Sequence, residues 1–194
     1  MLFSPRLFKI ICAAFGTSML ARQGVHATIP ADVSIPTPTF EPVYDATLLL
    51  VPNVAQDLVA GPFGERAFIG FLGGNLTNYA TGALEGQIIP GFGGEFGVVS
   101  SSNGMFYTDV ALAVQWTDDD KYAFLRVHGV GELGNSTYAT SYTRLETDST
   151  TRQNLVENVL LVSIVVDTNN SPSNETLGYF RLFVMNSTKP SISP

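Results

Sequence analysis

Hydrophobic and polar residues alternate along most of this chain in short runs that end at glycine, asparagine, aspartate or proline. Such alternation is typical of β-strands, because successive side chains of a strand point to opposite faces. The segment 149–156 is the one that favours a helix, with Asp148 or Ser149 as its cap. Runs rich in β-branched and aromatic residues predict nine strands, at 43–51, 66–72, 83–89, 95–100, 105–116, 122–131, 137–145, 159–167 and 177–185.

The connections between these strands are short. Asn103-Gly104 is a strong hairpin signal, because this pair tolerates the positive φ angles of a tight turn, and 117–121 predicts the next hairpin. We therefore expect an all-β fold, a single antiparallel β-barrel of about eight to ten strands. A two-sheet sandwich is the alternative, but closure of a barrel removes the exposed sheet edges. A barrel of this size can hold one small ligand.

The first 27 residues have the form of a secretory signal peptide. Arg6 and Lys9 precede an apolar run at 10–21, which is too short to span a bilayer, and 25–27 fits a cleavage site. An uncleaved anchor is the alternative. We expect a secreted protein with a proline-rich extended lead-in at 28–42, a barrel domain at 43–186 and a C-terminal tail at 187–194.

Removal of the signal would leave 167 residues, enough for one domain. Cys12, the single cysteine, would leave with it, so the core must provide stability without disulfides. The remaining chain has seven basic and 17 acidic residues, a net charge of −10. Such a chain repels phosphate backbones and anionic lipids, which argues against nucleic acid and membrane partners.

Five asparagines have the form of N-glycosylation acceptors, which fits a eukaryotic secretory route. The acceptor at 169 is the weakest, because Pro172 follows its sequon. The five are Asn75, Asn135, Asn169, Asn174 and Asn186.

Two glycine-rich stretches place charged residues beside backbone that bends tightly or packs closely. Arg66 follows Gly64-Glu65, and Glu95 follows Gly93-Gly94. The Arg66 guanidinium can hold an oxyanion through paired hydrogen bonds, or it can form a structural ion pair with a neighbouring glutamate. Apolar surroundings would raise the pKa of Glu95 and suit its carboxyl group to general acid or base chemistry.

The predicted strand 105–116 has two different faces. Its odd positions, which include Tyr107 and Asp109, mix small residues with a phenol and a carboxylate, as a ligand cavity often does. A packed layer beneath another sheet is equally compatible. On the next strand Arg126 and His128 share a face. We name Asp109 with Arg66 and Glu95 as catalytic candidates, and Tyr107, Trp116, Arg126 and His128 as ligand-binding candidates.

No motif for a metal or a cofactor is found. His128 is the single histidine after the predicted cleavage site, and a zinc site needs more such ligands. A Ser-His-Asp triad would need His128 and lacks a Gly-x-Ser-x-Gly elbow, and no phosphate-binding or dinucleotide motif is present. Asp118-Asp119-Asp120 lacks the spacing of a calcium loop and favours a solvated turn. We expect no metal and no cofactor.

The glycine motifs also carry a family resemblance. Gly64-Glu65-Arg66 followed by Gly73-Gly74 resembles family 3237 of the domains of unknown function, small proteins of bacteria and fungi. The later Gly-Gly-x-Asp-Trp signature of that family is altered here, at 93–96. Asp109 matches the family, although Ala111 stands where an arginine is common, and 145–148 resembles a late Phe-Glu-Thr segment. The resemblance covers about 40–185 and implies a β-barrel with a central pocket.

Two classes of function follow. In the first, the barrel binds a small apolar or aromatic molecule and is a cofactor-free cyclase, isomerase or stereochemical guide. Allene oxide cyclases and dirigent proteins, which have similar barrels, act in this way, and the comparison is an analogy of fold. Arg66 would then steady an oxyanion while Glu95 or Asp109 moves a proton. In the alternative, the protein is a non-catalytic ligand carrier or a secreted surface or structural protein.

Overall fold

The computed structural model describes residues 28–52, 58–134, 137–167, 176–186 and 191–192, so the expected signal peptide lies outside the described residues. The chain forms two compact units. In the small unit, β1 (Val33–Ser34) pairs antiparallel with β13 (Ser191–Ile192), so part of the expected C-terminal tail is a strand. All other elements belong to the large unit, residues 36–189.

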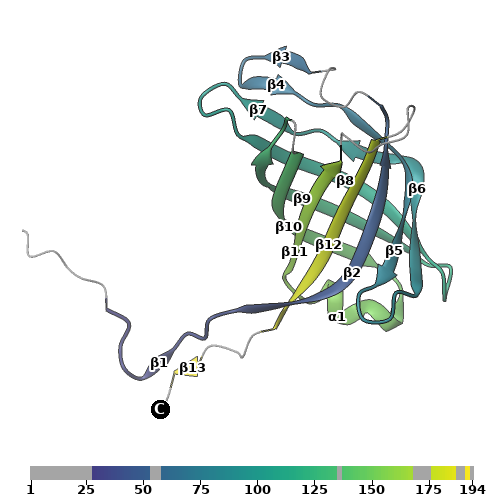
Figure 1. Ribbon diagram of the computed structural model, residues 1–194. Coiled ribbons are helices and arrows are strands. Elements are labelled where there is room, and N and C mark those ends of the chain that lie inside the picture. The colour runs from purple at the N-terminus through teal and green to yellow at the C-terminus, as the bar shows by residue number, and fades with distance from the viewer. Residues whose placement is uncertain (1–27, 53–57, 135–136, 168–175, 187–190, 193–194) are drawn as a thin grey trace, which may run out of the picture. The chain divides into compact units, whose positions relative to one another are not determined.

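The large unit is a closed antiparallel β-barrel of eight strands (Figure 1). Their order around the wall is β8-β6-β5-β2-β12-β11-β10-β9, and pairing of β8 with β9 closes the barrel. This confirms the expected fold class. The strands are β2 (Thr39–Leu50), β5 (Ile69–Asn78), β6 (Leu84–Glu95), β8 (Phe106–Trp116), β9 (Tyr122–Glu132), β10 (Thr137–Thr147), β11 (Leu160–Asp167) and β12 (Thr176–Asn186).

One short helix is found in the described residues, where the sequence predicts it. A 3-10 turn, η1 (Thr150–Arg152), continues into α1 (Gln153–Val156) at one end of the barrel (Figure 1). No helix in the described part of the chain is long and apolar enough to cross a membrane.

Three short strands extend from the barrel at the end opposite α1 (Figure 1). β7 (Val98–Ser100) pairs with the start of β8, β4 (Gly64–Arg66) pairs with β7, and β3 (Val59–Gly61) pairs with β4. The predicted strands 66–72 and 95–100 are therefore each divided between the barrel and this extension. The division follows from a crossing of the two segments, where the Ala67 N–H donates to the Gly97 carbonyl at 2.9 Å.

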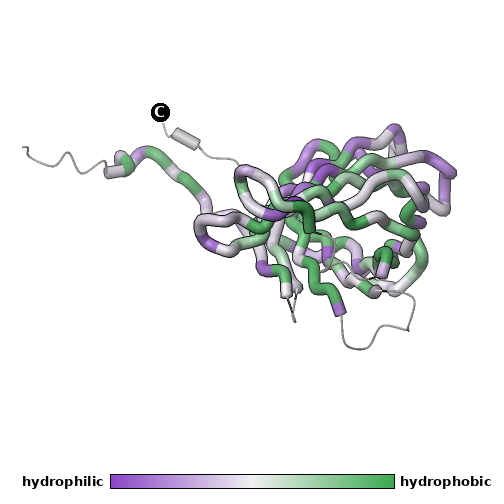
Figure 2. The backbone as a smooth tube through the Cα atoms, turned by 90° about the horizontal axis from the view of Figure 1, so that it is seen from above, coloured by the Kyte–Doolittle hydropathy of each residue, from purple (hydrophilic) through white to green (hydrophobic). Residues whose placement is uncertain are grey.

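Side chains alternate between the interior and the surface along the barrel strands. Figure 2 shows hydrophobic and hydrophilic residues interspersed along the backbone of the barrel. On β10, Thr137, Ala139 and Ser141 are buried, whereas Tyr138 and Tyr142 are exposed. Each of the eight strands contributes buried side chains to the interior. Its fully buried apolar side chains include Leu48, Leu76, Val114, Trp116, Leu125, Leu160 and Leu182.

The strand β2 begins earlier than predicted. Thr39 pairs with Asn186 of β12, so the last four residues of the expected lead-in, 39–42, lie in a barrel strand. Pro42 is tolerated there because β5 begins to pair with β2 only at Tyr44, which leaves one edge of this part of β2 without a β5 partner.

Candidate functional site

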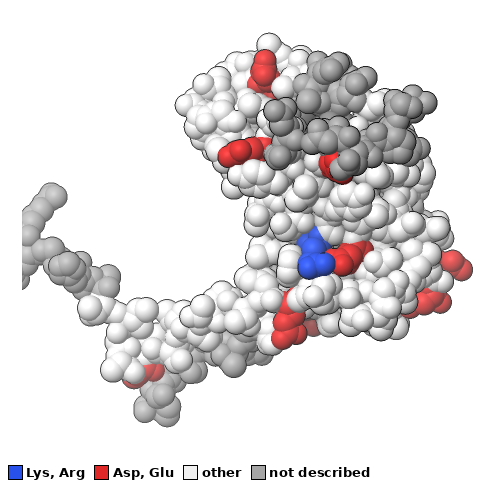
Figure 3. Space-filling view, in the orientation of Figure 1, with Lys and Arg blue, Asp and Glu red and all other residues white. Residues whose placement is uncertain are grey.

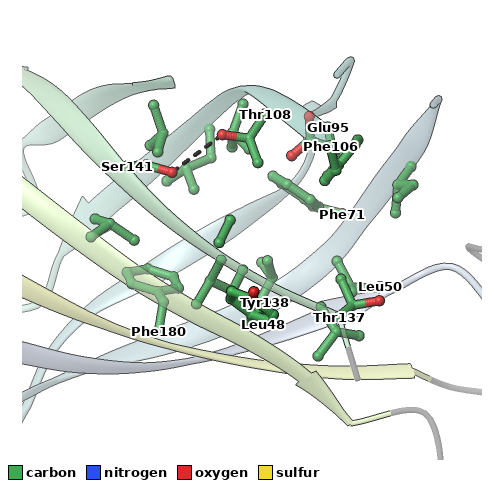
Figure 4. Close-up of a pocket in the computed structure, with 18 of the residues that line it drawn as sticks. Leu48, Leu50, Phe71, Glu95, Phe106, Thr108, Thr137, Tyr138, Ser141 and Phe180 are labelled. Atoms are coloured by element: carbon green, nitrogen blue, oxygen red, sulfur yellow. Dashed lines mark hydrogen bonds between the residues drawn. The ribbon is translucent and has the colours of Figure 1, made fainter. Parts of the chain in front are cut away.

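The barrel interior contains a cavity of about 60 Å³ in the half near β7 (Figure 4). Most of its lining is apolar. In the close-up, Leu48, Leu50 and Phe180 lie on one side, and Glu95, Thr108 and Ser141 lie on the opposite side. A cavity of about 150 Å³ is known to hold benzene. In this conformation the interior therefore has room for only a few non-hydrogen atoms.

Glu95 is the one carboxyl-bearing residue among the described residues that line the cavity, and no described lysine, arginine or histidine lines it. The residue is 7% exposed. It is the last residue of β6, and its Oε1 accepts the backbone N–H groups of Gly97 at 2.7 Å and of Asp109 at 2.8 Å. These two bonds fix the carboxyl group at the point where β6, β7 and β8 meet.

Burial raises the pKa of Glu95 from 4.5 to about 7, although the N–H groups of Asp109 and Gly97 favour the charged form. Gly97 is required for this arrangement. A Cβ atom at position 97 would lie 2.6 Å from Glu95 Oε1 and 2.8 Å from the Phe106 ring. The carboxyl group is therefore packed closely, buried and able to exchange a proton near neutral pH.

A pair of hydroxyl groups provides the other polar part of the lining. Thr108 of β8 and Ser141 of β10 are both buried, and their Oγ atoms lie 3.2 Å apart. Both residues pair in register with Gly129 of β9, whose missing side chain lets the two hydroxyls meet. A Cβ at position 129 would overlap Ser141 Oγ.

Arg66, the first predicted catalytic residue, does not line the cavity. It lies in β4, in the extension, and its Nη1 donates to the Phe96 carbonyl at 2.6 Å. This bond joins the extension to the chain just after Glu95. Arg66 thus neighbours Glu95 along the backbone, but its guanidinium is neither in the cavity nor in an ion pair with a described glutamate.

The odd face of β8 points outward, so the interpretation of that face as a cavity wall is wrong. Asp109 Oδ1 forms an ion pair with Arg126 Nη2 at 2.6 Å and lies 3.5 Å from His128 Nδ1. Tyr107 is also outside and accepts a hydrogen bond from Asn103 at 2.9 Å. The side chain of Asp109 is thus on the outer wall, although its backbone N–H reaches Glu95 inside.

Trp116 is inside the barrel but at the α1 end, away from the cavity lining. Its ring lies under the guanidinium of Arg152, with 4.1 Å from Cζ to the ring centroid. Arg152 is 4% exposed and pairs with Glu85 at 2.8 Å and Asp118 at 2.9 Å. We call this cluster of Trp116, Arg152, Glu85 and Asp118 the plug. The sequence does not predict it, because the pattern around Asp118 indicates only a solvated turn.

Among the residues the structure describes, no group of three or more His, Cys, Asp or Glu side chains is placed to hold a metal ion. Two predicted glycosylation acceptors, Asn75 and Asn186, are described, and both are exposed. The other three, Asn135, Asn169 and Asn174, lie outside the described residues.

The described residues form a closed barrel with a mainly apolar interior and, among them, one buried carboxyl group, that of Glu95. Such an interior can accept a small apolar group, hydrogen-bond one polar atom and transfer a proton. No family model and no curated protein matches the chain.

Several solved structures share the fold, and the likeness shows the fold alone. A protein with unknown function from Clostridium acetobutylicum has a TM-score of 0.61 at 14% identity, over 79% of this chain and 100% of that one. A conserved protein of unknown function from Rhodopseudomonas palustris has a TM-score of 0.58 at 18% identity, over 78% of this chain and 100% of that one. A beta-barrel like protein from Acinetobacter baumannii has a TM-score of 0.59 at 18% identity, over 79% of this chain and 99% of that one.

Proposed function

We propose that the protein is a secreted barrel that binds a small, mainly apolar molecule in its interior, and that Glu95 anchors the polar group of that molecule. The observation that carries the proposal is a buried carboxyl group on the wall of an otherwise apolar cavity, with no charged partner among the described residues. Its two N–H donors offset part of the cost of burial, but an ionisable group with a perturbed pKa on the wall of a cavity is also a typical feature of a functional site.

The lining favours one kind of ligand. Glu95, or the hydroxyl pair of Thr108 and Ser141, can bond a hydroxyl, phenol or amine, while the rest of the lining contacts hydrocarbon. The ionised carboxyl group would repel an anionic ligand. Because the cavity holds only a few atoms, an aromatic ligand must widen the interior. Such a ligand would enter at the end near β7, since Trp116 and Arg152 fill the α1 end.

A cofactor-free isomerase, cyclase or stereochemical guide is the second candidate function, and the raised pKa of Glu95 favours it. A carboxyl group that titrates near neutral pH serves as both acid and base. In this version Glu95 alone moves the proton. The positions of Arg66 and Asp109 outside the cavity give them no contact with a ligand there, so Arg66 holds the backbone near Glu95 and Asp109 belongs to the outer wall. Membership of family 3237 stays a prediction that fits either version.

The test uses phenol and toluene, which have similar shapes and differ in a hydrogen-bonding group. Methyl resonances of Leu48, Leu125 and Val127, all in the lining, are followed by NMR as each probe is added. We expect phenol to shift them at lower concentration than toluene does, and Glu95→Gln to remove most of this preference. Glu157→Gln, at an exposed position, is the matched control and keeps the preference.

If neither probe shifts the lining resonances, the interior is a filled core and the proposal is wrong. If phenol binds but Glu95→Gln leaves its affinity unchanged, the cavity binds ligands without the proposed anchor. Turnover of a captured native ligand by wild type and not by Glu95→Gln would establish the isomerase version. Binding without turnover would establish the carrier.

A further inference from the structure

Asn75 lies on the outer wall of the barrel, in β5, and its side chain is exposed. It begins Asn75-Leu76-Thr77, an acceptor sequence for N-glycosylation. Leu76 points into the core, so the asparagine and the threonine share the outer face. Within the described residues, no hydrogen bond occupies the Asn75 amide. At Asn186, the other described acceptor, the amide nitrogen donates to Glu41 at 2.9 Å.

Two grooves flank Asn75 on this wall, with volumes of about 630 and 600 Å³. Thr47, Asn75 and Tyr179 line both of them. These residues form one row across three strands, since Asn75 pairs with Thr47 and Thr47 pairs with Tyr179. Two strand spacings separate Asn75 from Tyr179, roughly 10 Å, which the first sugars of a glycan can cross.

The groove surface suits a sugar chain. Tyr179 is 45% exposed and presents an aromatic ring, and the short side chain of Thr47 leaves the path to it open. Arg181 and Asp45, joined by two hydrogen bonds, provide donors and acceptors at the edge of one groove. Figure 3 shows that this side of the barrel has few charged groups, with one basic group beside an acidic one near its middle.

We infer that Asn75 carries an N-linked glycan whose first sugars lie in these two grooves and cover Tyr179. The C–H faces of a sugar ring pack against an exposed aromatic ring, and its hydroxyls bond the polar groups at the edge. This inference shares with the proposed function only passage through the secretory pathway.

The full chain is expressed in a yeast that secretes and N-glycosylates proteins, and the secreted protein is mapped by mass spectrometry of its glycopeptides. We expect Asn75 to be occupied in wild type and unmodified in Asn75→Gln. Thr77→Ser is the matched control, because serine keeps the acceptor sequence and the hydroxyl that bonds the Asp45 carbonyl at 3.2 Å. Occupancy therefore persists in Thr77→Ser. Absence of a glycan on Asn75 overturns the inference.

The second measurement tests the contact with the groove. Endoglycosidase H trims the Asn75 glycan on the folded protein and on the same protein unfolded in urea. We expect trimming of the folded protein to be roughly 2- to 10-fold slower, the factor that one aromatic contact provides. Tyr179→Ala, which keeps the acceptor, removes most of this difference. Equal rates in folded wild type and folded Tyr179→Ala would overturn the groove contact. Phenol binding to the interior is measured separately and does not depend on either outcome.

Discussion

Among the residues that the structure describes, the two halves of the barrel interior each bury one charged side chain, and only one of the two has oppositely charged partners. At the α1 end, Arg152 is paired with Glu85 and Asp118 and lies over Trp116. In the half near β7, Glu95 accepts two backbone N–H groups and has no described cation beside it. Arg152 is 4% exposed and Glu95 is 7% exposed.

Under the proposed function, this difference separates a structural charge from one that binds a ligand. Arg152 is matched by opposite charges, so removing it leaves its partners unsatisfied, as in other buried ion pairs. Glu95 is unmatched, and a glutamine could accept the same two N–H groups without the cost of burying a negative charge. This is the reason for proposing that the carboxyl group at position 95 acts on a ligand.

The largest expected effect comes from Arg152→Met, which removes the paired charge while keeping an apolar stem. We expect a loss of about 3 kcal/mol in the free energy of unfolding, at the lower end for a broken buried pair because Glu85 and Asp118 are partly solvated. Urea denaturation measures it. Arg144→Met, at an exposed ion pair, is the control and should cost less than 1 kcal/mol, roughly. Equal losses in the two variants would contradict a structural role for the plug.

Glu95→Gln should act in the opposite direction, and the effect should depend on pH. Folded Glu95 binds its proton more tightly than the unfolded chain does, because its pKa is raised from 4.5 to about 7. The proton therefore stabilises the folded state fully below pH 4.5, and this stabilisation is lost as the pH rises through 7. Relative to wild type, Glu95→Gln should gain about 2 to 3 kcal/mol between pH 5 and pH 8. Urea denaturation at four pH values measures this difference in the free energy of unfolding. Glu157→Gln is the control, and its difference from wild type should not change with pH. A pH-independent difference for Glu95→Gln would refute the prediction.

Gly97→Ala should have a smaller effect that tests the packing around Glu95. The added Cβ would press on the Tyr107 carbonyl oxygen, Glu95 Oε1 and the Phe106 ring, so we expect a loss of about 2 kcal/mol. Gly134→Ala is the control, because nothing lies within 4 Å of a Cβ there. Thermal unfolding of the two variants measures the contrast. Similar melting temperatures would mean that Gly97 is packed less closely against Tyr107, Glu95 and Phe106 than the structure shows.

Asp109→Asn should have the smallest effect. The ion pair of Asp109 with Arg126 lies on the outer wall, with both side chains about a third or more exposed, and such pairs contribute roughly 0 to 1 kcal/mol. Phenol affinity should not change, since the Asp109 backbone N–H that reaches Glu95 is kept. An affinity loss as large as that of Glu95→Gln would move the site to the outer wall.

The fold could be predicted because alternation and turn residues mark barrel strands directly. On β10, alternate positions are buried from Thr137 to Leu145, and Asn103-Gly104 lies in the turn before β8. The local sequence pattern does not determine the register between strands that are distant in sequence. The division of 95–100 between β6 and β7 could therefore not be predicted from the sequence.

The site was predicted only in part, for the same reason. Glu95 is found in the cavity with the environment expected for it, but the alternation along β8 defines two faces without saying which is inward. The size of the side chains was the available signal: Phe106, Leu112 and Trp116 share one face, and large apolar groups belong inside. Arg152 gave no local signal, because its partners Glu85 and Asp118 come from other hairpins.

The titration of the Glu95 carboxyl group, followed through its ¹³C resonance by NMR in the folded protein, tests the central claim most directly. We expect a midpoint near pH 7, and a change in that midpoint when phenol is added but not when toluene is added. A midpoint at the ordinary value of 4.5 would show a carboxyl group in contact with water and would contradict the account. A midpoint near 7 that phenol does not move would show a buried carboxyl group without a role in binding.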